Sequence, residues 1–292
     1  MGRTTSISWC DHDRNFWLGC SEVFEVDPIT RRKEVDNGVC RKCYLKRGNG
    51  RFLDFGHIKY LSFENAERDL MKWSTGRVFI ENMGDYLHEA VPDAMVDKLV
   101  AVLERVDHYK MNAEVRVHQW QLLTKRAARM EKYWRRYMQI TGHTIGSNKW
   151  LGVSVGNKAS TYYINHLKNL AKISPDFIPF ISFEPLLEDL MDFDGTYRAL
   201  VEDNPHDAIS QRYAGLFDSV GMIDLTGIKW AIIGGESDYK DPRPMNPVWA
   251  ENIISNCKKY GVAVFFKQIG GLGGDNAGGC IINGKEIKEF PK

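Results

Sequence analysis

Three cysteines near the start of the chain carry the clearest chemical signal in the sequence. Cys40 and Cys43 form a tight Cys-x-x-Cys pair, and Cys20 lies upstream of them. Three thiolates that converge on one point can hold a soft metal centre, either an iron–sulfur cluster or zinc. A structural zinc site needs a fourth ligand, and Cys10 or His12 is close enough in sequence to supply it. The spacing alone leaves both kinds of metal centre open.

The composition is that of an ordinary globular protein. Of 292 residues, 43% are hydrophobic and 26% are charged. The net charge of only +1 gives no overall electrostatic attraction to nucleic acid, a membrane surface or an acidic partner. We find no leader peptide, and no apolar run approaches the roughly 18 residues of a spanning helix. We therefore expect a cytoplasmic protein with no membrane partner, whose cysteines are metal ligands or buried thiols rather than disulfides.

Short apolar runs rich in β-branched and aromatic residues recur along the chain. Most are apolar on both faces, which is typical of strands in a parallel sheet that is covered on both sides. Helical periodicity fills several of the segments between them, as in residues 91–106 and 246–261. The runs expected to be strands span residues 76–83, 114–124, 149–155, 177–186, 228–236 and 261–268, with a further strand near residues 5–9.

Strands that alternate with helices predict an α/β fold, and seven of them favour a full or partial (β/α) barrel over an open doubly wound sheet. No linker divides the chain, so residues 1–292 are expected to form a single domain, with a cysteine-bearing loop at 17–44. Residues 187–227 are longer and more polar than any other connection. They are expected to be an insertion that caps one end of the barrel.

Polar residues where the strands end are candidate site residues, because the loops at that end of a barrel converge on one cavity. Glu184 lies within an apolar run and must be paired, hydrogen-bonded or functional, and we interpret Glu236 in the same way. Ser154 and Asn157 are more often helix caps than ligand groups. The candidates are Asn82, Asp85, His88, Thr124, Lys125, Arg126, Ser154, Asn157, Glu184, Gly234, Gly235, Glu236, Ser237, Lys267 and Gln268.

A series of phrases along nearly the whole chain resembles a three-cysteine family of phage and bacterial proteins, largely unassigned in function. That family belongs to or borders the radical S-adenosylmethionine (radical SAM) superfamily. The phrases are NFWLGC, CRKCY, FIENMGDYLHEAVP, LLTKRAARM, WLGVSVGN, FISFEPLL, IIGGES followed by RPM, and FFKQIGG. The resemblance implies a full or partial TIM-barrel-like fold in which three cysteines hold a [4Fe–4S] cluster and leave one iron open.

By this resemblance, the cluster ligands are Cys20, Cys40 and Cys43. The open iron would bind SAM, and the reduced cluster would cleave it to a 5′-deoxyadenosyl radical that abstracts hydrogen from a substrate carbon. A reducing donor such as flavodoxin or ferredoxin would supply the electron. Catalytic roles are expected for Lys125, Glu184 and Glu236. Contacts to SAM are expected from Asn82, Asp85, Ser154, Asn157, Glu184, Gly234, Gly235 and Glu236.

The substrate is less closely defined by the sequence. The phage setting of the relatives favours a modified nucleobase or nucleotide of phage DNA. One predicted helix face carries Lys125, Arg129, Lys132 and Arg136, which could contact phosphates, although a solvated helix face is the reading we favour.

The alternative function is a non-catalytic, zinc-stabilised barrel that binds nucleic acid or a protein partner. The sequence does not choose among isomerase, lyase and transferase chemistry. It also does not tell whether SAM is consumed, whether the substrate is a polymer, or what the oligomeric state is. The role of the polar segment 21–39, between Cys20 and Cys40, is open as well.

Overall fold

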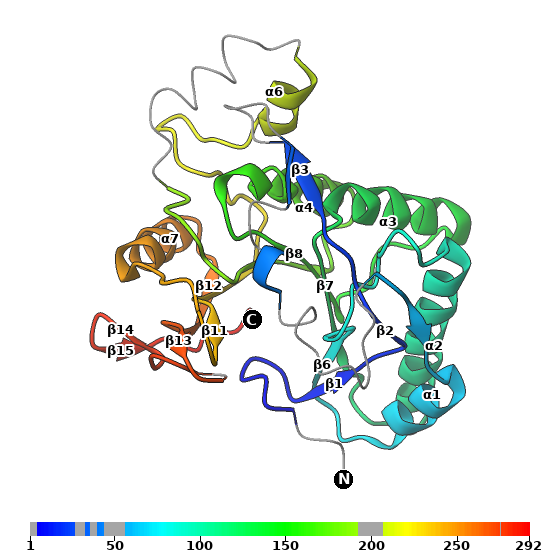
Figure 1. Cartoon of the computed structure of the whole chain (residues 1–292). Coiled ribbons are helices and arrows are strands. Elements are labelled where there is room, and N and C mark those ends of the chain that lie inside the picture. Colours follow the sequence, from blue (N-terminus) through cyan, green and yellow to red (C-terminus); the bar gives the residue numbers. More distant parts are fainter. Residues whose placement is uncertain (1–4, 27–32, 36–39, 44–55, 192–206, 275) are drawn as a thin grey trace.

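A parallel sheet forms the centre of the molecule (Figure 1). The computed structural model describes residues 5–26, 33–35, 40–43, 56–191, 207–274 and 276–292. The seven strands follow one another in the order β1-β6-β7-β8-β9-β10-β12, and every neighbouring pair is parallel. Their bounds are β1 His12–Arg14, β6 Arg77–Ile80, β7 Gln119–Thr124, β8 Lys149–Ser154, β9 Ile178–Phe183, β10 Trp230–Gly234 and β12 Ala263–Gln268.

The sheet is curled, and within the described residues its edge strands β1 and β12 do not pair with each other. The expected α/β architecture is therefore confirmed in the form of a half-barrel. Six of the seven strands fall within the predicted runs. The prediction of a strand at residues 5–9 was wrong. Trp9 leaves the sheet and packs its ring 4.6 Å from that of Phe79, and the edge position is taken by the polar strand β1.

Helices connect most of the strands and lie outside the curled sheet (Figure 1). Local sequence sets their ends: Ser62 Oγ accepts the backbone N–H of Asn65 to cap α1, and α3 stops at Gly142, whose φ of +70° suits glycine. No helix in the described ranges is long and apolar enough to cross a membrane. The helices are α1 Phe63–Lys72, α2 Asp93–Asn112, α3 Ala127–Thr141, α4 Tyr163–Ile173, α6 Ala208–Tyr213 and α7 Pro247–Lys259, with single 3-10 turns η2 Cys40–Lys42 and η4 Lys158–Ser160.

Short two-stranded ribbons form separately from the main sheet. The β3–β4 hairpin belongs to the segment between the first two cysteines, and β3 lies close to η4, at the end of β8. The ribbons pair β2 Trp17–Leu18 with β5 Lys59–Tyr60, β3 Phe24–Val26 with β4 Lys33–Val35, β11 Ser237–Asp238 with β13 Gly271–Leu272, and β14 Ile281–Ile282 with β15 Lys285–Glu286.

The two faces of the sheet carry different side chains because neighbouring residues of a strand point to opposite sides. On β7, Trp120 and Leu122 join the large apolar cluster beneath the helices, whereas Leu123 packs on the inner face. Phe180 covers Gly152 so closely that a Cβ there would lie 2.4 Å from its ring. The inner cluster consists of Trp9, Cys10, Phe79, Trp150, Phe180, Trp230, Ile232 and Phe265.

Of the predicted insertion 187–227, residues 187–191 and 207–227 are described, and the second of these segments packs beside α4 and α7 on the outside of the sheet. Tyr213 Oη donates to the carbonyl of Ala159 over 2.8 Å, and Asn256 Nδ2 of α7 donates to the carbonyl of Ile223 over 2.9 Å. Residues 192–206 lie outside the described residues. The expectation that the insertion caps the barrel thus stays a prediction.

Candidate functional site

An ion pair occupies the inner face at the carboxyl ends of β9 and β12. Lys267 Nζ donates to Glu184 Oε1 over 2.5 Å, with 11% and 19% of the two side chains exposed. Ser154 Oγ donates to the Glu184 carbonyl over 3.3 Å. Gly234 lies beside the pair, since a Cβ there would be in ordinary contact with the Glu184 carboxyl carbon at 3.5 Å. The structure thus brings together four candidate residues, Ser154 of β8, Glu184 after β9, Gly234 of β10 and Lys267 of β12.

Asn82 lies after β6, with β7 and β8 between its strand and that of Glu184. Its Nδ2 donates to Asp13 Oδ2 over 3.1 Å, and Asn15 Nδ2 donates to its Oδ1 over 2.5 Å. Asn82 therefore joins the loops that follow β1 and β6. A ligand contact from this side chain would have to compete with these two bonds.

Asp85 is a buried carboxylate that joins the ends of β6 and β7. It accepts from Thr124 Oγ1 over 2.7 Å, from the Lys125 backbone N–H over 3.1 Å and from Arg126 over 3.0 Å. Burial alone would raise the pKa of Asp85, but the Arg126 guanidinium and these hydrogen bonds hold it below its ordinary value. Asp85 therefore stays ionised and holds the site together, with its oxygens engaged inside the protein.

Arg126 links this carboxylate to the first predicted cluster cysteine. Its guanidinium also binds Glu89, over 2.9 Å from Nη2, and its Nη1 lies 3.8 Å from Cys20 Sγ. Burial raises the pKa of the Cys20 thiol, while the positive charge of Arg126 acts in the opposite direction. A guanidinium beside a buried thiol favours the thiolate, which is the form that binds metals.

The cysteines predicted to hold the cluster come from two segments. Cys20 follows Gly19, which bridges to Gly84 beyond the end of β6. Cys40 begins η2 and Cys43 follows it, and the Cys43 N–H donates to the Cys40 carbonyl over 3.3 Å. Cys43 also raises the pKa of Cys20, so the two thiols are near each other. Within the described ranges, however, no three His, Cys, Asp or Glu side chains form a group that could hold a metal ion.

The η2 turn is tied to a distant part of the chain. Lys42 Nζ donates to the carbonyl of Asp241 over 3.1 Å and also to its carboxylate. In the same loop, Glu236 accepts three hydrogen bonds from Arg243, the shortest over 2.6 Å. Burial raises the pKa of Glu236, but Arg243, with help from Lys42, brings it below the ordinary value. Glu236 is thus an ionised partner of Arg243, next to the cysteine turn.

Gly235 allows the loops after β10 and β12 to touch. A Cβ at this position would lie 1.9 Å from the Ile269 carbonyl oxygen, which explains the glycine. The side chain of Gln268 holds the same two loops, since its Nε2 donates to the Gly235 carbonyl over 2.9 Å and to Ser237 Oγ over 2.6 Å, and its Oε1 accepts from the Asn276 N–H over 2.7 Å. Gly235 therefore has a packing role of its own.

Asn157 and Lys125 are two further predicted site residues, and they have different local roles. Asn157 Oδ1 accepts the N–H of Ser160 over 3.1 Å, so the capping interpretation is confirmed for this residue. Lys125 follows β7, and its positive charge lowers the pKa of Cys20. The structure brings Lys125 to the cysteines and separates it from Asn157, which follows β8.

The suggestion of Cys10 or His12 as a fourth metal ligand was wrong. Cys10 is buried in the inner aromatic cluster, and its Sγ contacts the carbonyl of Ile7. His12 pairs through Nε2 with the carbonyl of Ser74 over 3.1 Å. Both residues lie before or at the start of β1, whereas Cys20 lies beyond its carboxyl end. A sequence distance of ten residues hid this separation because a strand runs between them.

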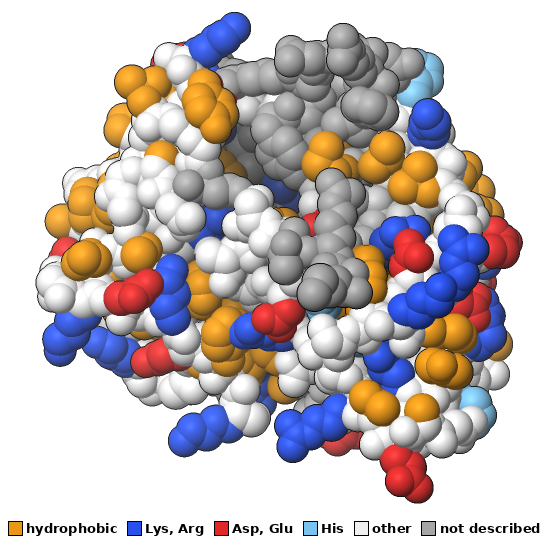
Figure 2. Space-filling model, turned by 90° about the horizontal axis from the view of Figure 1, so that it is seen from below, with side chains coloured by type: hydrophobic (Ala, Val, Ile, Leu, Met, Phe, Trp, Pro, Cys, Tyr) orange, Lys and Arg blue, Asp and Glu red, His pale blue; other side chains and the backbone are white. Residues whose placement is uncertain are grey.

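The basic helix face is largely paired with acidic residues of α2. Arg129 Nη2 lies 2.6 Å from Asp93, and Arg136 Nη2 lies 2.6 Å from Asp97. On the face shown in Figure 2, Lys and Arg side chains are interspersed with acidic and hydrophobic ones. These arginines therefore fasten α3 to α2, in agreement with the non-functional interpretation of the stripe.

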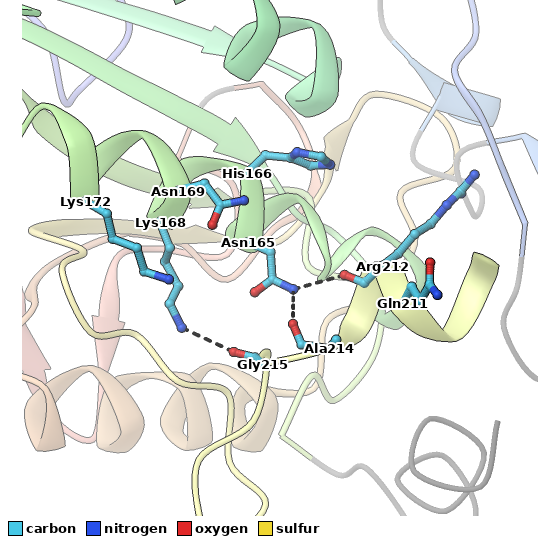
Figure 3. A pocket seen from close by; sticks show the side chains of 9 residues that line it. All are labelled: Asn165, His166, Lys168, Asn169, Lys172, Gln211, Arg212, Ala214 and Gly215. Carbon is cyan, nitrogen blue, oxygen red and sulfur yellow. Dashed lines mark hydrogen bonds between the residues drawn. The ribbon is translucent and has the colours of Figure 1, made fainter. Parts of the chain in front are cut away.

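A polar cavity of about 390 Å³ lies between α4 and the turn after α6 (Figure 3). Asn165 Nδ2 donates to the carbonyls of Arg212 and Ala214, and Lys168 Nζ donates to that of Gly215. Lys168 is also paired with Asp224 over 2.5 Å. The donors that line the cavity hold residues 207–227 onto α4, so we interpret it as an attachment surface.

Two buried polar residues near the site were missed by sequence reasoning. Glu81 has a φ of +65°, and its Oε1 accepts the N–H groups of Phe16 and Trp17 over 2.5 and 3.3 Å. Burial raises its pKa well above the ordinary value. Gln121 lies on the inner face, fully buried, and neither of its side-chain polar atoms has a partner among the described residues. Its signal was a polar residue in the middle of an apolar strand.

The fold and the site define an α/β half-barrel protein with polar groups, and with Cys20, where its parallel strands end. Residues 4–291 match the family model described as Protein of unknown function (DUF5131), so the chain belongs to this family. No curated protein and no solved structure matches the chain.

Proposed function

We propose that this protein is a radical SAM enzyme that holds a [4Fe–4S] cluster with Cys20, Cys40 and Cys43, and that its parallel sheet is a partial barrel of the radical SAM type. The observation that supports this most directly is the position of the three cysteines. Cys20 lies beyond the carboxyl ends of β1 and β6, and the turn that bears Cys40 and Cys43 contacts, through Lys42, the segment that follows β10. A parallel half-barrel places its chemistry at this edge of the sheet. Their resemblance to the three-cysteine pattern agrees with that position.

The donor set suits such a cluster. Two of the three thiols belong to one turn, since Cys40 begins η2 and Cys43 follows it, and Arg126 lies beside the third. Soft thiolates are the ligands of iron–sulfur clusters, whose net negative charge a neighbouring guanidinium would offset. The thiols have to draw closer to form the site, and in this proposal the η2 turn moves toward Cys20. When bound, the cluster would supply the electron that cleaves SAM.

The inner face offers complementary groups for the rest of SAM. Glu184 and Lys267 present one negative and one positive charge on neighbouring inner positions, which match the ammonium and carboxylate of a methionine group. The aromatic cluster beneath them excludes water from the centre of the half-barrel. In this proposal, ligand binding at this charged and apolar face would hold a reactive species away from solvent while a substrate carbon is presented to it. We take the substrate to be a nucleobase or nucleotide, including a modified base of phage DNA.

Metal analysis after anaerobic purification tests this function against the zinc-stabilised alternative. We expect a brown protein with about four irons per chain, and Ala substitution of Cys20, Cys40 or Cys43 should each abolish that content. Cys257→Ala and Cys280→Ala are matched controls, since both thiols lie outside the site and should leave iron unchanged. Colourless protein with one zinc per chain would overturn the proposal in favour of a structural metal.

A further inference from the structure

Gln121 and Gln268 are two buried glutamines on strands of the same sheet, and their surroundings are opposite. The Gln268 amide makes three hydrogen bonds that hold two loops together. The Gln121 amide is fully buried, and within the described ranges neither its Oε1 nor its Nε2 has a hydrogen-bond partner. Burying an unpaired donor and acceptor is costly, so such a group calls for an explanation.

The Gln121 side chain points into the half-barrel. Its neighbours on β7, Trp120 and Leu122, belong to the outer cluster beneath the helices, so the residue between them faces inward. The residues directly opposite on the adjacent strands are Phe79 and Trp150, and both belong to the inner aromatic cluster. The Gln121 amide is therefore a polar group between the aromatic side chains of Phe79 and Trp150, and we call this surface the aromatic wall.

Above this wall, toward the carboxyl ends, lie Ser154 and the Glu184–Lys267 pair. The inner face thus runs from aromatic rings with one unpaired amide to a rim of charged and hydroxyl groups. A planar ring would stack against the aromatic side chains, and polar substituents would meet the rim. An amide presents a donor and an acceptor side by side, which match the edge of a nucleobase.

We propose that Gln121 reads the nucleobase of a ligand bound inside the half-barrel. The Gln121 amide is covered by other side chains, so binding displaces the inner side chains above it, such as Leu123 and Phe180, whose ring lies against Gly152. The base belongs either to SAM or to the substrate. This inference deepens the nucleobase form of the proposed function, but its test needs no cluster.

The sharpest test is Gln121→Met, which removes both polar atoms and keeps a similar unbranched shape. If the amide waits for a ligand, the free protein should become more stable, with a melting temperature higher by about 2–4 °C. Gln268→Met is the matched control and should lower the melting temperature, because its three partners lose their bonds. A lower melting temperature for Gln121→Met would show that the amide has a structural role and would overturn the proposal.

Binding of free nucleosides to the purified chain completes the test. Adenosine, guanosine, cytidine, thymidine and S-adenosylhomocysteine are titrated against wild type and Gln121→Met by calorimetry. We expect at least one of them to bind wild type and to lose about tenfold or more in affinity in the variant. Loss confined to adenosine and S-adenosylhomocysteine assigns the base to SAM, and loss with another nucleoside assigns it to the substrate. Binding of none of them, or equal binding by both proteins, overturns the proposal whatever the metal content.

Discussion

The outer and inner faces of the sheet treat buried polar groups in different ways. On the outer face, Asp107 of α2 accepts from Trp120 Nε1 and Lys149 Nζ, each over 2.9 Å, so a buried carboxylate, indole and ammonium satisfy one another. On the inner face, Gln121 has no partner in the described part of the chain, and Glu184 faces Lys267 at a partly open rim. The network around Asp107 therefore serves stability, whereas the inner-face groups are the ones to which the proposed function assigns ligand binding.

Among the variants that test this difference between the two faces, Asp107→Ala should have the largest effect on the free energy of unfolding. The substitution leaves the Lys149 ammonium, only 8% exposed, without its carboxylate and also orphans the Trp120 N–H. We expect a loss of about 3–5 kcal/mol in the free energy of unfolding, measured by urea denaturation. His108→Ala, at the exposed neighbouring position on α2, should change it by less than about 0.5 kcal/mol. A comparable loss in both variants would break the assignment of stability to this buried network.

The next largest expected effect is a loss in the free energy of unfolding at acidic pH, caused by His118. Its Nε2 pairs with the Leu70 carbonyl over 2.9 Å, and burial lowers its pKa from 6.5 to about 4. The unfolded chain binds the proton more tightly, so stability is complete above pH 6.5 and falls as the pH drops toward 4. Between pH 7 and pH 5 this residue should account for roughly 2 kcal/mol.

His118→Gln isolates that contribution, since an amide nitrogen can still donate to Leu70 but does not titrate. Urea denaturation of both proteins at pH 7 and pH 5 gives the difference. We expect the variant to lose less stability than wild type over this interval. Equal losses would mean that carboxylates elsewhere, and not the buried histidine, set the acid limit.

On the inner face, Glu184→Gln should weaken ligand binding and also lower stability. Lys267 keeps a polar neighbour, but its side chain is only 11% exposed and loses the charge of its partner, so the free energy of unfolding should fall by about 1–3 kcal/mol. If the proposed function holds, SAM affinity should fall about tenfold, because the ammonium of SAM loses a charged partner. Calorimetric titration with SAM measures this, and Glu286→Gln on the exposed hairpin is the control. Unchanged affinity would make Glu184 a structural residue.

The smallest expected effect concerns the helix face that carries the arginines. Arg136 pairs with Asp97 at the surface, with 33% and 46% of the side chains exposed, so Arg136→Gln should cost about 0.2–1 kcal/mol. The loss should shrink in 1 M salt because ions screen an exposed pair. A cost that does not respond to salt would show that the guanidinium contributes through packing rather than charge.

The strand order could be predicted because apolar runs of strand length alternate with helices, and that pattern leaves few topologies. The first strand escaped detection because His12, Asp13 and Arg14 have no apolar pattern, and β6 alone fixes them in the sheet. The location of the candidate site also followed from the topology. Its polar residues lie at the carboxyl ends of the strands, as parallel strands require.

The pairings within the site could not be predicted. Glu184 and Lys267 are 83 residues apart, and Lys42 and Asp241 are 199 residues apart. The sequence around each of these residues does not indicate its partner, because the pairing depends on how the sheet curls. The unpaired state of Gln121 was hidden for the same reason, since only the assembled inner face shows which neighbours an amide lacks.

The contact between Lys42 and Asp241 has a consequence for the order of assembly during synthesis. The turn that carries Cys40 and Cys43 is made early, but the residue that fastens it appears 199 residues later. While the ribosome is still producing the intervening strands, the turn lacks this contact. If the proposed function holds, a cluster on Cys40 and Cys43 gains it only when the chain is nearly finished.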